Sequence, residues 1–126
     1  MEKFDIAATA RTPHMSFDPD TGSFLLEGES YPEDTKKFYD APLSSVYEFL
    51  DTELTLSAVF SFKLKYFNSS SAKVLMDLFV AVEESAQRGN LFKIEWHCAA
   101  DDDNMQELGE EFAEELDKTE FAMVAF

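Results

Sequence analysis

Apolar residues alternate with polar ones in several stretches of this chain, which is the pattern of a strand with one buried face. The clearest case runs from Phe60 to Tyr66, where Phe60, Phe62, Leu64 and Tyr66 would all point into the core. The residues Asp18 to Gly22 are of types favoured in tight turns, and they separate two short apolar stretches. They therefore predict a hairpin. In chain order, we expect strands near residues 4–8, 15–17, 24–26, 60–66, 92–98 and 121–126.

A spacing of three and four residues between apolar positions predicts three helices. Pro42 would begin the first, since a proline lacks the N–H that has no partner in a first turn. Arg88 and Gly89 would end the second. The three apolar faces are Leu43, Val46, Tyr47, Leu50 and Leu54; Val74, Leu75, Leu78, Phe79, Val82 and Ala86; and Met105, Leu108, Phe112 and Leu116.

The predicted order is three strands followed by three helix–strand units. Strands that alternate with helices indicate β-α-β connections and one sheet with helices packed on it. Because the strand faces are unequally apolar, the helices should lie mainly on one side. A length of 126 residues suits one domain over residues 1–126.

Charge and cysteine content narrow the possible partners and compartment. The formal net charge is −16, which disfavours nucleic acid and anionic membranes because both would repel the surface. No apolar run has the length of a membrane span. The lone Cys98 fits a reducing compartment, so we expect a cytoplasmic protein that binds other proteins.

The sequence contains few residue patterns that are typical of a catalytic or cofactor-binding site. The four glycines lie far apart, so there is no phosphate loop. His97 and Cys98 are neighbours on a predicted strand and would face opposite sides, with Cys98 in the core. The acidic run Asp101 to Asp103 reads as the start of a helix. We therefore expect no enzyme activity, cofactor or metal.

One stretch stands out, the three serines Ser69 to Ser71 between the strand at 60–66 and the helix at 74–86. The first N–H groups of a helix lack partners, so a serine here can cap the helix. A phosphate would also be tolerated at this end of the helix dipole and would add about −1.5 to −2 charges. The residue pattern leaves both interpretations open. It also leaves Tyr31, in the break before the first helix, as either a core-edge residue or an exposed contact.

Five short motifs occur here in an order and spacing that resemble the SiaC family of bacterial regulatory phosphoproteins across essentially the whole chain. They are Gly28-Glu29-Ser30-Tyr31-Pro32-Glu33, Tyr66-Phe67-Asn68-Ser69-Ser70-Ser71-Ala72-Lys73, Met76-Asp77-Leu78-Phe79, Arg88-Gly89 and Trp96-His97.

The resemblance implies an α/β fold like that of the STAS domain of anti-sigma-factor antagonists, with a mixed β-sheet and helices packed against it. It also implies a phosphorylation switch without enzyme activity. A protein Ser/Thr kinase would add the phosphate and a PP2C-type phosphatase would remove it. The unphosphorylated form would bind and activate a diguanylate cyclase, which raises cyclic di-GMP and promotes biofilm formation.

Position by position, the resemblance makes Ser69 the phosphoacceptor, with Ser70 as second choice. The family motif has Thr where this chain has Ser69, so the hydroxyl is kept but enzyme preference is open. The partner would contact a surface made of Tyr31, Pro32, Asn68, Ser69, Ser70, Ser71 and Lys73.

Three other functions remain consistent with the sequence. The chain could be an anti-sigma-factor antagonist that acts on transcription through an anti-sigma kinase. It could be a small acidic hydrolase that uses its carboxylate clusters, or a structural adaptor whose serines only cap a helix.

Overall fold

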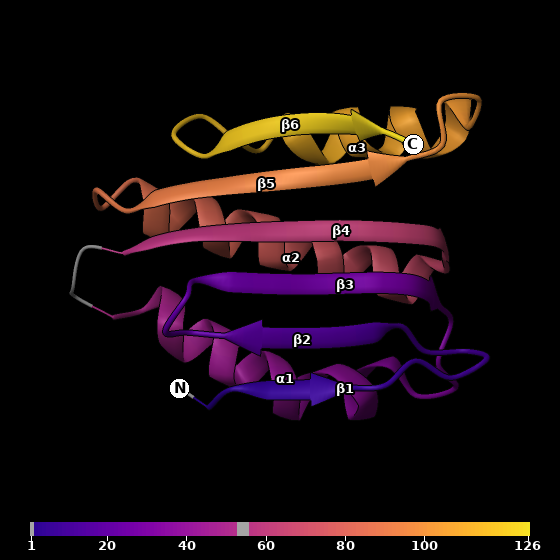
Figure 1. Cartoon of the computed structure of the whole chain (residues 1–126), viewed down its shortest axis with the longest axis horizontal. Coiled ribbons are helices and arrows are strands. Elements are labelled where there is room, and N and C mark those ends of the chain that lie inside the picture. Colours follow the sequence, from indigo (N-terminus) through magenta and orange to yellow (C-terminus); the bar gives the residue numbers. More distant parts are fainter. Residues whose placement is uncertain (1, 53–55) are drawn as a thin grey trace.

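The computed structural model describes residues 2–52 and 56–126, and in these residues six strands form one mixed sheet. The strands lie side by side in chain order, with antiparallel pairs among the first three and parallel pairs from the third to the sixth (Figure 1). The elements are β1 (Phe4–Ile6), β2 (His14–Asp18), β3 (Ser23–Ser30), α1 (Thr35–Leu50), β4 (Ser57–Phe67), α2 (Ser69–Ala86), β5 (Leu91–Cys98), α3 (Asp103–Ala113) and β6 (Glu120–Ala125).

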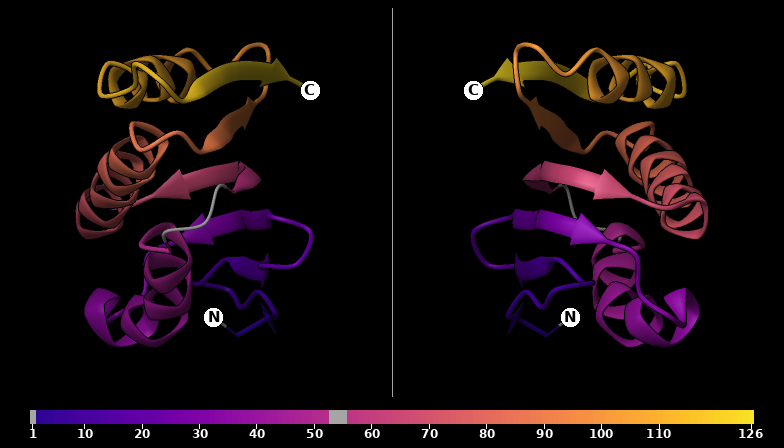
Figure 2. Two further views of the ribbon diagram at one scale, coloured as in Figure 1. Left: turned by 90° about the vertical axis from the view of Figure 1, so that its left-hand side faces the viewer. Right: turned by 90° about the vertical axis from the view of Figure 1, so that its right-hand side faces the viewer.

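All three helices cover the same face of the sheet and leave the opposite face open (Figure 2). This confirms the predicted element order and the one-sided helix layer. The core between the layers is rich in aromatic rings, with Phe62, Phe79 and Trp96 in mutual contact. Cys98 is buried, as predicted, and His97 lies on the other side of β5. No helix in the described ranges is long and apolar enough to cross a membrane.

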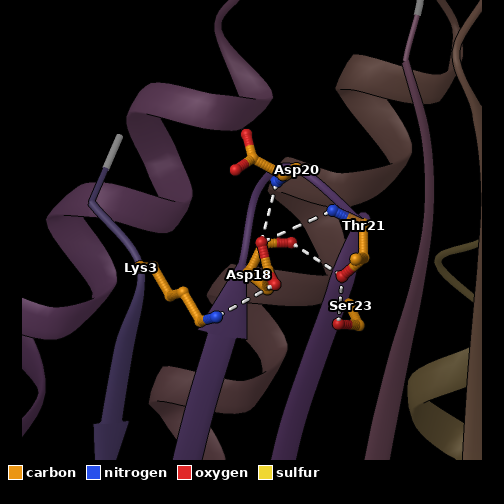
Figure 3. A network of polar contacts seen from close by, with 5 residues as sticks. All are labelled: Lys3, Asp18, Asp20, Thr21 and Ser23. Atoms are coloured by element: carbon orange, nitrogen blue, oxygen red, sulfur yellow. Dashed lines mark hydrogen bonds and ion pairs between the residues drawn. The ribbon is translucent and has the colours of Figure 1, made fainter.

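The predicted hairpin is present, and Asp18 organises its turn (Figure 3). Its carboxylate accepts hydrogen bonds from the N–H groups of Asp20 (3.0 Å) and Thr21 (3.4 Å) and pairs with the Lys3 ammonium at 3.5 Å. Gly22 then adopts φ +67°, a left-handed conformation that a residue with a Cβ adopts only with strain. The turn therefore fixes the register between β2 and β3.

The prediction that Pro42 begins the first helix is wrong. α1 begins at Thr35, where the Asp34 carboxylate caps it by accepting from Lys37 N at 3.0 Å, and Pro42 lies inside the helix. Proline has no N–H, so one backbone hydrogen bond of the helix is missing at this position. The buried side chains of Tyr39 and Leu43, on either side of Pro42, keep the helix packed against the core despite this loss. Leu54, predicted for the same face, lies outside the described residues.

The prediction that Tyr66 points into the core is also wrong. Gly28 of β3 pairs with Leu64, but Glu29 pairs with Tyr66, so Lys65 is an extra residue in β4. Such a bulge reverses the sides of the residues that follow it. Tyr66 is consequently 52% exposed, and Phe67 takes its place in the core.

Candidate functional site

The amino end of α2 lies directly behind the carboxyl end of β4, with Asn68 as the single residue between them. The Asn68 side chain accepts a hydrogen bond from Ser71 N at 2.9 Å and so caps the helix. Its own N–H donates to the Ser30 carbonyl at 3.0 Å, which ties the cap to the end of β3. The interpretation that a serine caps this helix is therefore wrong, because the amide of Asn68 fills that role.

The cap sets the rotation of the helix, and the three serines consequently have different surroundings. Ser71 is 1% exposed, and its hydroxyl lies within 2.8 Å of the Ser30 hydroxyl, which in turn lies 2.6 Å from the Tyr39 hydroxyl. Burial raises the pKa of Tyr39 to about 12, although its hydrogen bonds to the two serines act in the opposite direction. Ser71 therefore lies beneath the predicted partner surface, where a docked protein would not touch it.

Ser70 is exposed, but its hydroxyl is engaged in two hydrogen bonds. It lies 2.6 Å from the Thr35 hydroxyl, at the start of α1, and donates to the Asn68 side chain at 3.2 Å. Ser69 is exposed as well, and its hydroxyl makes no hydrogen bond to any of the described residues. Of the three hydroxyls, that of Ser69 is the most available to another molecule.

The other predicted surface residues lie around this helix end. Lys73 is exposed four residues after Ser69, which is one helical turn further along α2. Tyr31 is half-buried, and its ring packs edge-on against the ring of Tyr66 with centroids 5.9 Å apart. Pro32 is half-buried beside it in the chain. Both interpretations of Tyr31 thus hold in part, and the exposed Tyr66 is a neighbour that the alternation pattern assigned to the core.

A groove of about 1120 Å³ begins at this site and runs between α1 and α2. The two helices start at the same end of the groove, where Thr35 and Ser70 meet. Two lysines of the lining, Lys36 and Lys73, lie near the starts of the two helices. The acidic residues of the lining come later in both helices and outnumber the lysines. The remaining lining residues are Tyr39, Asp40, Leu43, Ser44, Tyr47, Glu48, Asp51, Thr52, Val74 and Asp77. Periodicity alone does not reveal the groove, because it depends on how two helices sit side by side.

The side chains around the amino end of α2 suit binding. In residues 2–52 and 56–126, no three His, Cys, Asp or Glu side chains gather in a way that could hold a metal ion. The features near the mouth of the groove are exposed serine hydroxyls, of which that of Ser69 makes no hydrogen bond to the described residues, a helix amino end and aromatic rings. These suit recognition by a protein and the acceptance of a negatively charged group.

Comparisons with known proteins agree with the motifs in the sequence. A family model described as "SiaC family regulatory phosphoprotein" matches residues 6–126. An uncharacterized protein of Pseudomonas aeruginosa strain UCBPP-PA14 is 32% identical over 116 residues, which is 91% of this chain and 90% of that protein.

Solved structures match over nearly the full length. Apo-SiaC from Pseudomonas aeruginosa aligns with a TM-score of 0.86 at 32% identity and covers 99% of this chain and 100% of that one. A second match comes from the structure of the diguanylate cyclase SiaD in complex with its activator SiaC from the same organism. It has a TM-score of 0.89 at 31% identity and covers 98% of this chain and 99% of that one.

Proposed function

We propose, since the chain belongs to the SiaC family of regulatory phosphoproteins, that it is a switch whose unphosphorylated form binds and activates a diguanylate cyclase. Phosphorylation of Ser69 would release the cyclase. The chain itself would catalyse nothing and would act through contact alone. The SiaD–SiaC complex of Pseudomonas aeruginosa supports a cyclase as the partner, because this chain is similar to the SiaC component.

The observation that carries the proposal is the contrast among the three serines. Ser71 is buried and Ser70 is hydrogen-bonded to Thr35, whereas Ser69 is exposed and its hydroxyl is unengaged by the described residues. A kinase needs an accessible hydroxyl, so this contrast favours Ser69 over Ser70.

A phosphate on Ser69 would leave the fold intact. It would lie at the amino end of an 18-residue helix, where the dipole and free N–H groups favour negative charge. Lys73, one turn further along, could pair with it.

The same phosphate would interfere with docking. The proposed contact surface consists of Tyr31, Pro32, Asn68, Ser69, Ser70 and Lys73, extended by Tyr66 and the mouth of the groove. A partner that covers this surface would enclose a phosphate of about −1.5 to −2 charges, of which the single ammonium of Lys73 offsets only one. Burying one unpaired charge costs several kcal/mol, or about a hundredfold or more in affinity.

Further parts of the proposal follow from the family resemblance. A protein Ser/Thr kinase would phosphorylate Ser69, a PP2C-type phosphatase would restore it, and both would act in the cytoplasm. The order of β-α-β units is compatible with a STAS-like fold in which residues 1–126 act as a single domain.

The test is to measure binding and cyclic di-GMP production with the purified diguanylate cyclase of the same organism. Ser69→Ala should bind and activate it like the unmodified chain. Ser69→Asp, which introduces one negative charge, should weaken binding about tenfold or more.

The matched control is Ser57→Asp, which adds the same charge at the exposed amino end of β4, at the other end of the sheet. It should bind normally. If Ser69→Asp and Ser69→Ala bind equally well, the switch at this position is refuted. Loss of binding in both Asp variants would point to general repulsion and not to a local contact.

A further inference from the structure

The open face of the sheet carries a row of ionisable side chains that crosses several strands. His14 of β2 pairs in register with Glu27 of β3, and Glu27 pairs with Lys63 of β4. Because Phe62 pairs with Trp96, Lys63 has His97 of β5 as its next neighbour. No helix covers this face (Figure 2), so the row is reachable from outside.

A cavity of about 470 Å³ lies over this row. Its lining includes His14, Glu27, Lys63, Lys65, His97 and Phe126. The volume falls within the range of small-molecule sites, about 300–1,000 Å³. The cavity is on the face opposite the groove between α1 and α2, so it is separate from the proposed partner surface.

Charge is distributed unusually around this cavity. The chain carries −16 overall, and Asp5 and Glu95 approach the Nε2 atoms of His14 and His97 from outside the lining, at 2.6 and 3.6 Å. The lining itself nevertheless holds two lysines and a single carboxylate. That carboxylate, Glu27, lies 3.9 Å from Nδ1 of His14, and neither lysine forms an ion pair with any of the described residues. The three other cavities described for this chain contain more carboxylates than lysines.

His97 contributes a second, independent observation. Its side chain is 16% exposed, and its Nε2 atom is buried without a hydrogen-bond partner among the described residues. The closest approach recorded is to the Glu95 carboxylate at 3.6 Å, which is beyond hydrogen-bond distance. Unsatisfied buried polar atoms are uncommon in folded proteins. A modest rotation of this ring toward the cavity would let a bound acceptor satisfy it.

We propose that this cavity binds a small anion through a phosphate or carboxylate group held between Lys63 and Lys65, with His97 as a further donor. Unpaired ammonium groups suit both kinds of oxygen anion. The apolar ring of Phe126 at the rim leaves room for a non-polar part of such a molecule.

The experiment is an NMR titration of the ¹⁵N-labelled full chain with sodium phosphate in one arm and sodium citrate in the other. Ionic strength is held constant with sodium chloride. Saturable shifts should appear at Lys63, Lys65 and His97, and the tighter arm identifies the preferred anion. The double variant K63Q/K65Q should weaken binding about tenfold or more, the loss expected for one charge-assisted hydrogen bond.

The matched control is K37Q/K118Q, which removes two charges from exposed positions that line neither this cavity nor the groove, and it should change the affinity less than twofold. The single variant K65Q, at an exposed position, provides a milder change if the double variant does not fold. The proposal is overturned if no saturable shift occurs, if both double variants lose binding equally, or if the shifts centre on Ser69 to Ser71.

Discussion

The two ends of α2 are built for different tasks. At its amino end, Ser69 and Ser70 are exposed, and only Ser71 is tied into the core. Towards its carboxyl end, Glu83 and Ser85 are buried polar residues with several hydrogen bonds each. One helix therefore combines an amino end with exposed hydroxyls and a carboxyl end whose polar side chains anchor the fold.

Glu83 is the centre of the anchored end. Its carboxylate accepts from the N–H groups of Lys118 (3.1 Å) and Thr119 (3.0 Å), just before β6, and from the Gln87 amide at 3.0 Å. Burial alone would raise the pKa of Glu83, but these bonds and one from the Asp117 N–H outweigh it and lower the pKa to about 2. A charged side chain thus fixes the entry to the edge strand. In contrast, a charge at the amino end would be exposed and free to act on a partner.

The largest expected effect is the loss of this anchor. Glu83→Ala would leave the buried N–H of Thr119 and the part-buried N–H of Lys118 without this acceptor, at a cost of about 3 kcal/mol in the free energy of unfolding. The neighbouring Glu84 is exposed, so Glu84→Ala should change stability by less than about 0.5 kcal/mol. Urea denaturation of both variants measures the difference. Equal stabilities would mean that Glu83 does not anchor β6.

Acid should weaken the same end. The pKa of Glu83 is lowered in the folded state, from 4.5 to about 2. Its contribution is therefore complete above pH 4.5 and is lost as the pH falls from 4.5 towards 2. The loss corresponds to about 2–3 kcal/mol. Glu83→Gln, which has no such titration, should show a correspondingly flatter dependence of stability on pH between 4.5 and 2. Parallel curves for the two proteins would contradict the assignment.

One side of this contrast, the amino end of α2, was accessible from sequence, whereas the role of Glu83 was not. The predicted strand at 60–66, the predicted helix at 74–86 and the serines between them mark the amino end of α2. The rotation of that helix was not accessible, because it depends on Asn68 binding both Ser71 N and the Ser30 carbonyl. Only this rotation distinguishes the exposed Ser69 from the buried Ser71.

The wrong predictions for Tyr66 and Pro42 concern features that depend on neighbouring elements. Tyr66 faces outwards because β4 has a bulge between the residues that pair with Gly28 and Glu29. The alternation within one strand does not reveal how that strand pairs with its neighbour, so it cannot predict such a bulge. Pro42 is tolerated inside α1 because Tyr39 and Leu43 are buried around it. The sequence signal that marks the start of α1 is Asp34, since aspartate is a residue type favoured at helix caps.

A smaller effect is expected within the amino end itself. Tyr39→Phe removes one hydroxyl from the buried cluster with Ser30 and Ser71 but leaves the bond between the two serines. The expected loss is about 1 kcal/mol in the free energy of unfolding. Tyr31→Phe is the control, since its side chain is half-buried and its recorded contact is through the ring. Thermal unfolding of both variants would reveal whether the cluster contributes to stability.

The smallest effect on stability should come from the residue proposed to matter most for regulation. Ser69→Asp places an exposed carboxylate in the first turn of α2, where the helix dipole favours it, so stability should stay constant or rise by about 0.5 kcal/mol. Ser71→Asp differs only by two positions, but it would force a carboxylate into the buried cluster and should cost about 2 kcal/mol. Chemical denaturation of the pair compares the same substitution on opposite sides of one helix.

A destabilised Ser69→Asp protein would contradict a switch that acts on docking without disturbing the fold. A stable one, combined with weakened binding, would separate the effect of the charge on the partner from any effect on folding.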